Sequence, residues 1–205
     1  MAKLKLGVLG STSGTDLQAV IDEIENGKLD AEIAVVISNK EDAFILERAR
    51  KHHLPVHFIP SKGKEREAFD REVAQVLEKH GVKLVLLIGY MRFLSKWFVD
   101  RHKDRIMNIH PSLLPAFAGG MDLDVHQAIL DQGVKVTGAT LHFVDEGADT
   151  GPIIAQKAVP IEDDDTKDSL KVKVQAAEQE LILKAIHLFK DGKLKVEGRK
   201  VRILA

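Results

Sequence analysis

Leu84-Val85-Leu86-Leu87-Ile88 is the stretch that decides the fold, because it is apolar at every position. A strand with one face in water alternates polar and apolar residues, whereas a strand that is apolar throughout is typical of a parallel sheet covered on both faces. The run is also far too short to cross a lipid bilayer. We therefore expect Leu84–Ile88 to be a buried strand of a parallel sheet.

Apolar runs of similar length precede this strand and alternate with longer amphipathic patterns. In the longer patterns the apolar residues recur every three or four positions, as they do on one face of a helix. The expected strands and helices of the first half follow in strict alternation, beginning with a strand: Leu4–Leu9, Leu17–Glu25, Glu32–Ile37, Phe44–His52, Val56–Ile59, Lys64–His80 and Leu84–Ile88. This order predicts a parallel sheet with right-handed crossovers.

The second half continues with both kinds of pattern and no repeat or linker. The expected helices are Trp97–His102, with Ser95 as its N-cap, Asp124–Gln132 and Thr166–Lys190. The expected strands are Arg105–Ile109, Val136–Val144, Ile153–Val159 and a terminal hairpin of Leu194–Val196 and Val201–Leu204. We therefore predict one α/β domain over residues 1–205. It has a mostly parallel twisted sheet, helices on both faces, and antiparallel strands toward the C-terminus.

Composition excludes several classes of function. The 205 residues include no cysteine, which excludes disulfides, thiolate zinc sites and a cysteine nucleophile. Thirty basic residues face 31 acidic ones, and a dedicated nucleic-acid binder carries a strong basic excess instead. The N-terminus lacks a long apolar stretch with a cleavage site, so we expect a cytoplasmic protein that handles small molecules.

The first strand-to-helix turn is Gly10-Ser11-Thr12-Ser13-Gly14-Thr15-Asp16-Leu17-Gln18. Small residues let the backbone approach a ligand, and a helix N-terminus offers N–H groups to an anion. The turn lacks both the dinucleotide and the P-loop signatures. Thr15 and Gln18 have the spacing of a capping box. We predict a phosphate site here; the alternative is an ordinary capped turn.

A second motif, Asn108-Ile109-His110-Pro111-Ser112-Leu113-Leu114-Pro115, closes a predicted strand. Asn108 and His110 are two residues apart and so point to the same side. Pro111 cannot continue a central strand, which places His110 at the carboxyl end, where open α/β sheets bind ligands. An amide donor beside an imidazole suits stabilisation of an oxyanion with nearby proton transfer. The alternative is a structural histidine.

A third motif is the acidic, glycine-containing loop within residues 142–152. Its carboxylates lack the spacing of an EF-hand. One carboxylate held against an imidazole would raise the histidine pKa and fix its tautomer. The residues alone leave Asp145, Glu146 and Asp149 as candidates.

Together these motifs resemble the folate-dependent formyltransferases. The resemblance runs from the first strand to the long helix at Thr166 and rests on Asn108–Pro115, Gly138, His142–Val144 and Asp149–Pro152, with Ser38–Lys40, Glu47–Arg50 and Gly89–Ser95 in addition. It implies a Rossmann-like variant with a phosphate-binding half, 1–100, and a catalytic, folate-binding half, 101–205. It further implies transfer of a formyl group from 10-formyltetrahydrofolate to the amine of phosphoribosylglycinamide in purine synthesis, without a metal, by a monomer or homodimer.

The resemblance also implies residue roles. The catalytic trio is Asn108, His110 and Asp149, in which Asp149 keeps His110 protonated so that His110 and Asn108 stabilise the oxyanion. The folate side is assigned to Arg66, Met91, Arg92, Phe93, Leu94, Asn108, Val144, Asp145 and Glu146. The acceptor side is assigned to Gly14, Thr15, Asp16, Pro111 and Glu178. Without the resemblance, Arg66 is interpreted equally well as a solvated helix residue paired with Asp70. Glu178 would be interpreted as a charged residue on the surface of its helix. A cis peptide is expected at Leu114-Pro115.

Two departures from the family pattern concern the acceptor or cofactor side. The family often has Gly-Ser-Asn-Leu where this chain has Gly14-Thr15-Asp16-Leu17, and the segment Ala116–His126 is slightly longer. Three rivals share some of the pattern. The tRNA-directed formyltransferases are longer chains with an RNA-contacting domain, and the formyltetrahydrofolate hydrolases carry an N-terminal regulatory domain. A folate- or nucleotide-binding module without catalysis is the third.

Overall fold

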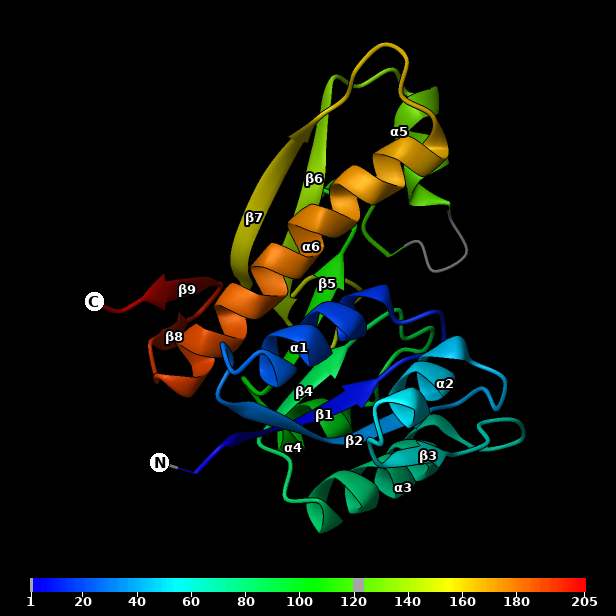
Figure 1. Cartoon of the computed structure of the whole chain (residues 1–205), viewed down its shortest axis with the longest axis vertical. Helices are drawn as coiled ribbons and strands as arrows, with labels where there is room; N and C mark the ends of the chain where they lie inside the picture. The colour runs from blue at the N-terminus through cyan, green and yellow to red at the C-terminus, as the bar shows by residue number, and fades with distance from the viewer. Residues whose placement is uncertain (1, 120–123) are drawn as a thin grey trace. The chain divides into compact units, whose positions relative to one another are not determined.

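The computed structural model describes residues 2–119 and 124–205, which fall into two compact units (Figure 1). The N-terminal unit spans Met1–Met107 with Val144–Glu146, and the C-terminal unit spans Asn108–Phe143 and Gly147–Ala205. Strand β5 (Ile106–His110) begins in the first unit and ends in the second.

The N-terminal unit has the predicted alternation of strands and helices. Its elements are β1 (Leu4–Leu9), α1 (Thr15–Glu25), β2 (Ala31–Ser38), α2 (Phe44–Lys51), β3 (Val56–Phe58), α3 (Arg66–Lys79), β4 (Leu84–Leu87) and α4 (Lys96–Arg101). The strand order is β3-β2-β1-β4-β5, and β1 pairs with both β2 and β4 in parallel. The predicted parallel sheet is therefore confirmed.

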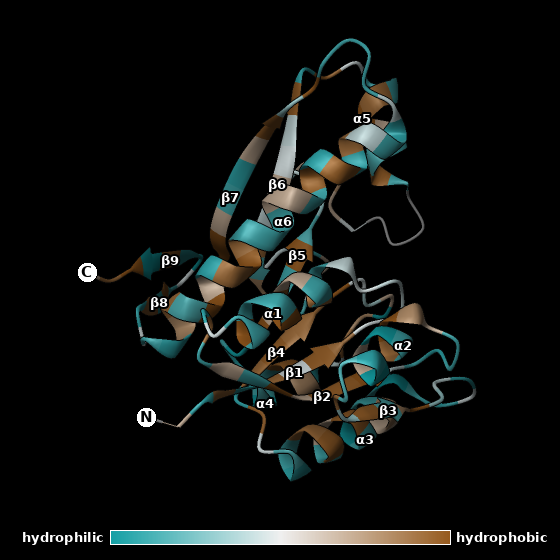
Figure 2. Ribbon diagram, viewed as in Figure 1, coloured by the Kyte–Doolittle hydropathy of each residue, from teal (hydrophilic) through white to brown (hydrophobic). Residues whose placement is uncertain are grey.

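Both faces of this sheet are covered by helices. Val35 and Ile37 of β2 pack with Phe69 of α3 in one apolar cluster, and α1 and α2 pack against β2 as well. Gly7 of β1 leaves room for α3, because a Cβ atom there would lie 2.5 Å from Leu77. Every residue of β4 is buried, as its continuous apolar sequence predicts, and the hydropathy colouring shows β1 and β4 as largely apolar (Figure 2).

The C-terminal unit carries the antiparallel strands. Its elements are α5 (Val125–Asp131), β6 (Val136–Phe143), β7 (Ile153–Pro160), α6 (Lys167–Lys190), β8 (Leu194–Glu197) and β9 (Lys200–Ile203). The strand order is β5-β6-β7-β9-β8, with β6–β7 and β8–β9 antiparallel and β7–β9 parallel. Helix α6 packs against β6 and β7. The fold class predicted from the sequence is confirmed.

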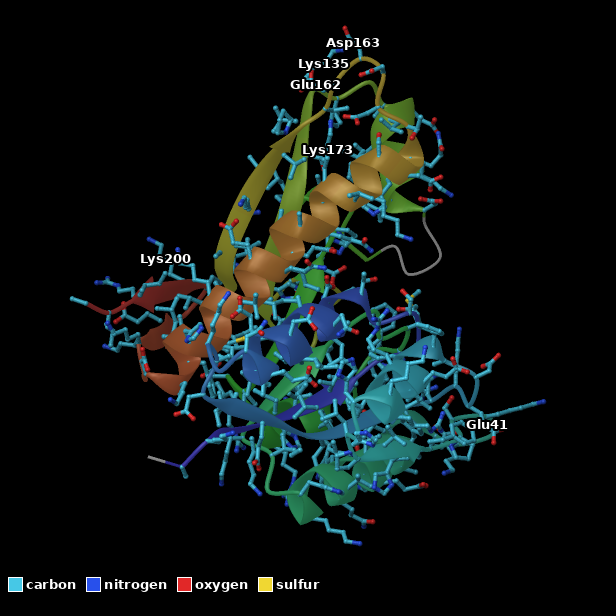
Figure 3. The ribbon with its side chains drawn as sticks, in the orientation of Figure 1. Glu41, Lys135, Glu162, Asp163, Lys173 and Lys200 are labelled. Carbon is cyan, nitrogen blue, oxygen red and sulfur yellow. The ribbon has the colours of Figure 1, made fainter. Side chains whose placement is uncertain are left out.

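The β6–β7 pair has two chemically different ends. Its outer end holds the exposed Lys135, Glu162 and Asp163 (Figure 3), and Lys135 Nζ lies 2.6 Å from Asp163 Oδ1. At the other end, His142 of β6 pairs with Ile153 of β7. The acidic loop, residues 144–152, connects the two strands at that end.

The N-cap predicted for α4 is confirmed, whereas the one predicted for α1 is wrong. Ser95 caps α4, since its side chain accepts a hydrogen bond from the Phe98 backbone. The capping box expected at Thr15 and Gln18 is wrong. Gly14 is the N-cap of α1, with a left-handed φ of 66° that glycine adopts without strain. Gln18 instead bonds the side chains of Asp22 and Arg48.

Among the described residues, none of the helices is both long enough and apolar enough for a bilayer.

Candidate active site

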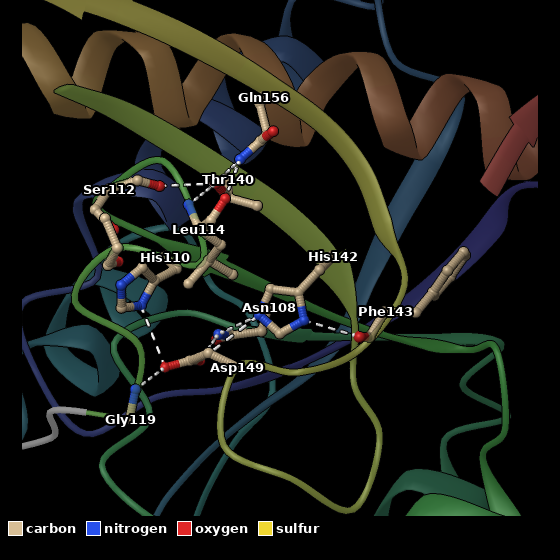
Figure 4. Close-up of polar contacts among 11 residues, drawn as sticks. Asn108, His110, Ser112, Leu114, Gly119, Thr140, His142, Phe143, Asp149 and Gln156 are labelled. Carbon is tan, nitrogen blue, oxygen red and sulfur yellow. Dashed lines mark hydrogen bonds and ion pairs between the residues drawn. The ribbon is translucent and has the colours of Figure 1, made fainter. Parts of the chain in front are cut away.

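Asn108 and His110 reach the same carboxylate from the end of β5. Asn108 Nδ2 lies 3.2 Å from Oδ1 of Asp149, and His110 Nδ1 lies 3.4 Å from Oδ2 (Figure 4). His110 is the last residue of the strand, directly before Pro111, as the sequence predicts. The i, i+2 spacing therefore places both side chains on one side of the strand.

Asp149 is fixed by its loop as well as by these partners. Its φ of 54° lies in the left-handed region, which Asp and Asn tolerate better than most residues. Oδ2 also accepts a hydrogen bond of 2.9 Å from the Gly119 backbone. Burial raises the pKa of Asp149. The His142 ring, the Gly119 amide and His110 lower it, and together they outweigh burial, so the pKa of Asp149 lies below its ordinary value. Asp149 is therefore an anion near neutral pH.

A second histidine, His142 at the end of β6, completes the cluster. Its Nε2 lies 3.1 Å from Asn108 Nδ2 and 3.6 Å from Asp149 Oδ1, and its Nδ1 lies 2.8 Å from the Phe143 carbonyl oxygen. The sequence motifs include His142 but assign it no role. The available signal was its place at the end of a buried strand, directly before the acidic loop.

His110 has one ring nitrogen without a hydrogen-bond partner among the described residues. The residue is 6% exposed, and its buried Nε2 has no hydrogen-bond partner within residues 2–119 and 124–205. Burial lowers the pKa of His110, Asp149 raises it, His142 lowers it and the Phe117 backbone raises it; the net result is a pKa below 6.5.

The direction of this pKa shift corrects the expectation that Asp149 keeps His110 protonated. The carboxylate acts in the expected sense, but the desolvation of the imidazolium outweighs it. His110 is therefore neutral near pH 7. With Nδ1 facing the carboxylate, the neutral ring carries its proton on Nδ1 and a lone pair on Nε2.

A buried polar network supports the loop after His110. Thr140 Oγ1 donates to the Ser112 carbonyl (2.7 Å) and accepts from the Leu114 backbone (3.0 Å) and from Gln156 (2.9 Å). A Cβ atom at Gly138 would overlap the Lys157 carbonyl, so only glycine fits there. The Leu114–Pro115 peptide is cis, as expected. The loop is thus tied to β6, next to His142.

A family model describing formyl transferases matches residues 4–186, which include this whole cluster. The chain belongs to the formyl transferase family. Its fold is likewise that of a solved family structure, glycinamide ribonucleotide transformylase 1 from Symbiobacterium toebii. That structure is similar with a TM-score of 0.93 and 44% identity, over 100% of this chain and 95% of the other.

Curated relatives are similar along nearly the whole of this chain. The phosphoribosylglycinamide formyltransferase of Escherichia coli (strain K12) is 39% identical over 194 residues, which cover 95% of this chain and 90% of the relative. The trifunctional purine biosynthetic protein adenosine-3 of Bos taurus is 41% identical over 202 residues. This formyl transferase spans only 20% of the length of that trifunctional relative.

Residues assigned to the folate side lie in the N-terminal unit, with the exception of Asn108. Met91 and Phe93 are partly exposed apolar residues, 36% and 45%, in the segment between β4 and α4. Ser11 accepts a hydrogen bond of 3.0 Å from the Met91 backbone, and the buried Asp70 accepts one of 2.5 Å from the Ser95 backbone. The segment is therefore held at both ends by side chains of other elements.

The two arginines of this group differ in their surroundings. The guanidinium of Arg92 lies 4.4 Å from the ring centroid of Phe69. Arg66 is exposed at the start of α3. Burial raises the pKa of Asp70, and the charges of Arg92 and Arg66 lower it in part. The charge of Arg66 thus acts on Asp70 of the same helix, while the Arg66 side chain itself is exposed.

The acidic loop divides between the units. Val144 donates from its backbone to the Ile106 carbonyl (2.9 Å), and Glu146 Oε1 lies 2.5 Å from Lys96 Nζ, all within the N-terminal unit. Asp149 belongs to the C-terminal unit. Of the three carboxylates left open by the sequence, Asp149 is the one beside the imidazoles.

Residues assigned to the acceptor also belong to both units. Gly14, Thr15 and Asp16 form the start of α1, and Asp16 is 7% exposed. Pro111 follows β5, and Glu178 of α6 is 7% exposed, which excludes a surface charge. The longer segment Ala116–His126 lies partly outside the described residues, at 120–123.

Proposed function

We propose that this protein transfers the formyl group of 10-formyltetrahydrofolate to the amine of phosphoribosylglycinamide, a step of de novo purine synthesis. The unpartnered Nε2 of His110, beside the Asn108 amide and the anionic Asp149, is the observation that carries the proposal. Membership of the family and the similar length of the Escherichia coli relative support it.

The residues present match the needs of this reaction. The neutral acceptor amine attacks the formyl carbon, and the carbonyl π electrons move onto oxygen. His110 begins neutral, so its Nε2 takes the proton that the amine loses. The imidazolium and the Asn108 amide then stabilise the oxyanion. When the C–N bond to N10 of the folate breaks, His110 returns the proton to that nitrogen.

Asp149 and His142 have supporting roles in this scheme. Asp149 holds Nδ1 of His110 and stabilises its charged state once the proton arrives. The two amide hydrogens of Asn108 face His142 and Asp149 before substrate binds. One of them must therefore turn to the oxyanion, and His142 and Asp149 hold the amide until then.

Substrate binding is proposed for the remaining assigned residues. Arg66, Met91–Leu94 and Val144–Glu146 would bind the folate, and Gly14–Asp16, Pro111 and Glu178 would bind the acceptor. We place the enzyme in the cytoplasm as a monomer or homodimer; light scattering on the purified protein tests the oligomeric state.

An acceptor screen tests the function. Purified protein with 10-formyltetrahydrofolate is followed by the appearance of tetrahydrofolate, with and without phosphoribosylglycinamide. We expect turnover that requires the acceptor and falls strongly in His110→Ala. Turnover without acceptor would identify a hydrolase, turnover only with another amine would identify a different transferase, and binding without turnover a non-catalytic module.

A further inference from the structure

The first turn of α1 has no side-chain cap. Its N-cap is Gly14, and no side chain bonds the first-turn amides from that position. A Cβ atom at Gly14 would overlap Ile45 of α2, so the sequence cannot place a capping side chain here. Uncapped N–H groups at a helix start favour an anion.

Asp16 brings a buried carboxyl into this same turn. Its side chain is 7% exposed, and Oδ1 has no hydrogen-bond partner among the described residues. The buried Asp70 differs, because its carboxylate accepts a hydrogen bond from the Ser95 backbone. A buried carboxylate without a partner is unfavourable, whereas the neutral acid can donate its O–H to an acceptor.

Several charged side chains of the elements that pack against α1 have partners of their own. Helix α1 packs against α2 and β2. From α2, Arg48 donates to the Ser13 carbonyl and to Gln18, and His52 pairs with Glu25. Glu32 of β2 pairs with Lys5.

Burial dominates the titration of Asp16. A helix N-terminus alone lowers the pKa of an acid, yet burial raises the pKa of Asp16 from 3.8 to about 7. Asp16 therefore holds its proton to unusually high pH.

We propose that Asp16 binds the phosphate monoester of the acceptor as a neutral acid, donating its O–H to one phosphate oxygen while the first N–H groups of α1 bind the others. This inference rests on the proposed function for the identity of the acceptor. The chemistry requires only an oxyanion that accepts a hydrogen bond.

Binding then consumes a proton whenever Asp16 is ionised in the free protein. Above about pH 7, affinity for the acceptor should fall by about tenfold for each pH unit, since one proton is linked to binding. The acceptor also titrates, but it contributes equally to every variant. Affinity for the folate should not share this dependence.

Calorimetric titration with ribose 5-phosphate tests the inference without turnover. Heats measured near pH 8, in two phosphate-free buffers of different protonation enthalpy, give the number of protons taken up. The proteins are the wild type, Asp16→Asn and Asp70→Asn, the last as a control for another buried carboxyl. Michaelis constants for acceptor and folate are measured from about pH 6 to about pH 9 in parallel.

We expect the wild type to take up about one proton on binding, as one titrating carboxyl requires. Asp16→Asn should take up none, and its KM for the acceptor should no longer rise above about pH 7. The role of Asp16 would be overturned if ribose 5-phosphate did not bind or if binding took up no proton. It would also be overturned if the uptake persisted in Asp16→Asn, or if it were lost in Asp70→Asn instead. Proton-linked binding without formyl transfer would overturn the proposed function but support the role of Asp16. Formyl transfer without proton uptake would support the proposed function but overturn the role of Asp16.

Discussion

Nδ1 of His142 lies 2.8 Å from the carbonyl oxygen of Phe143, and this contact orients the amide of Asn108. A carbonyl oxygen only accepts hydrogen bonds, so Nδ1 carries the proton and Nε2 of the neutral ring is an acceptor. Asn108 can then donate one amide hydrogen to Nε2 and the other to Asp149. The imidazole thus favours one of the two orientations of the amide, with its NH₂ group toward the cluster.

Replacement of His142 by phenylalanine tests this orienting role. His142→Phe keeps an aromatic ring but leaves one Asn108 hydrogen without an acceptor. We expect kcat to fall about tenfold, with smaller changes in either KM, and stability to fall by about 1–3 kcal/mol, the cost of an unsatisfied buried group. The control is His102→Phe, because buried His102 also bonds a backbone carbonyl through Nδ1 but belongs to the C-terminal end of α4. Equal kcat losses in both variants would contradict the role.

The pair Asp149 and His110 should act as a unit. Asp149→Asn keeps the side-chain shape and tolerates the left-handed φ of 54°. We expect it to lower kcat by on the order of 10²-fold or more, with little change in substrate binding. The double variant with His110→Ala should be scarcely worse than His110→Ala alone. Multiplication of the two single effects would show that Asp149 works independently of His110.

Titration of His110 by NMR should reveal the competition between burial and the carboxylate. We expect a midpoint below 6.5, because burial is the largest influence on this pKa. Asp149→Asn removes the main raising influence, so its midpoint should move lower still. In the wild type, the group stabilises the folded protein above its unfolded pKa, and this contribution is lost as the pH falls through the folded pKa. A wild-type midpoint above 6.5 would contradict this expectation and would mean that Asp149 raises the His110 pKa more than burial lowers it.

Much of the fold followed from the sequence, whereas the electrostatics of the site did not. Continuous burial of Leu84–Leu87 and the strand end at Pro111 have local causes, namely apolar sequence and a missing N–H. The lowered pKa of His110 arises mainly from its burial in the folded protein, and Asn108 meets His142 and Asp149 from 34 and 41 positions away in the sequence. The predicted N-cap at Thr15 was wrong because a tertiary contact, the packing of Ile45 against Gly14, sets where α1 begins.

Removal of the Thr15 hydroxyl should cost little stability, in contrast to the loss of a true N-cap. Thr15 is the first residue of α1, and Gly14 precedes it as the cap. We expect Thr15→Ala to change the unfolding free energy by less than about 0.5 kcal/mol, as at a site outside the caps and core. Thr166→Ala is the matched comparison, because the Thr166 side chain caps α6; it should cost about 1 kcal/mol. Urea unfolding of both variants measures the difference, and equal losses would restore Thr15 as a cap.

Asp16→Asn should stabilise the free protein at high pH and leave it unchanged at low pH. The folded pKa of about 7 lies above the unfolded value of 3.8, so the folded state binds more protons between these limits and stability falls as pH rises through them. The difference between these two pKa values corresponds to a penalty of about 4 kcal/mol once the carboxylate is ionised. We therefore expect a gain of up to about 4 kcal/mol near pH 8 and little change near pH 4, measured by urea unfolding. Asp22→Asn, on an exposed side chain of the same helix, is the control and should show no such divergence. If Asp16→Asn lost the same stability at both pH values, the carboxyl would be part of a structural hydrogen bond and its burial would carry no electrostatic penalty.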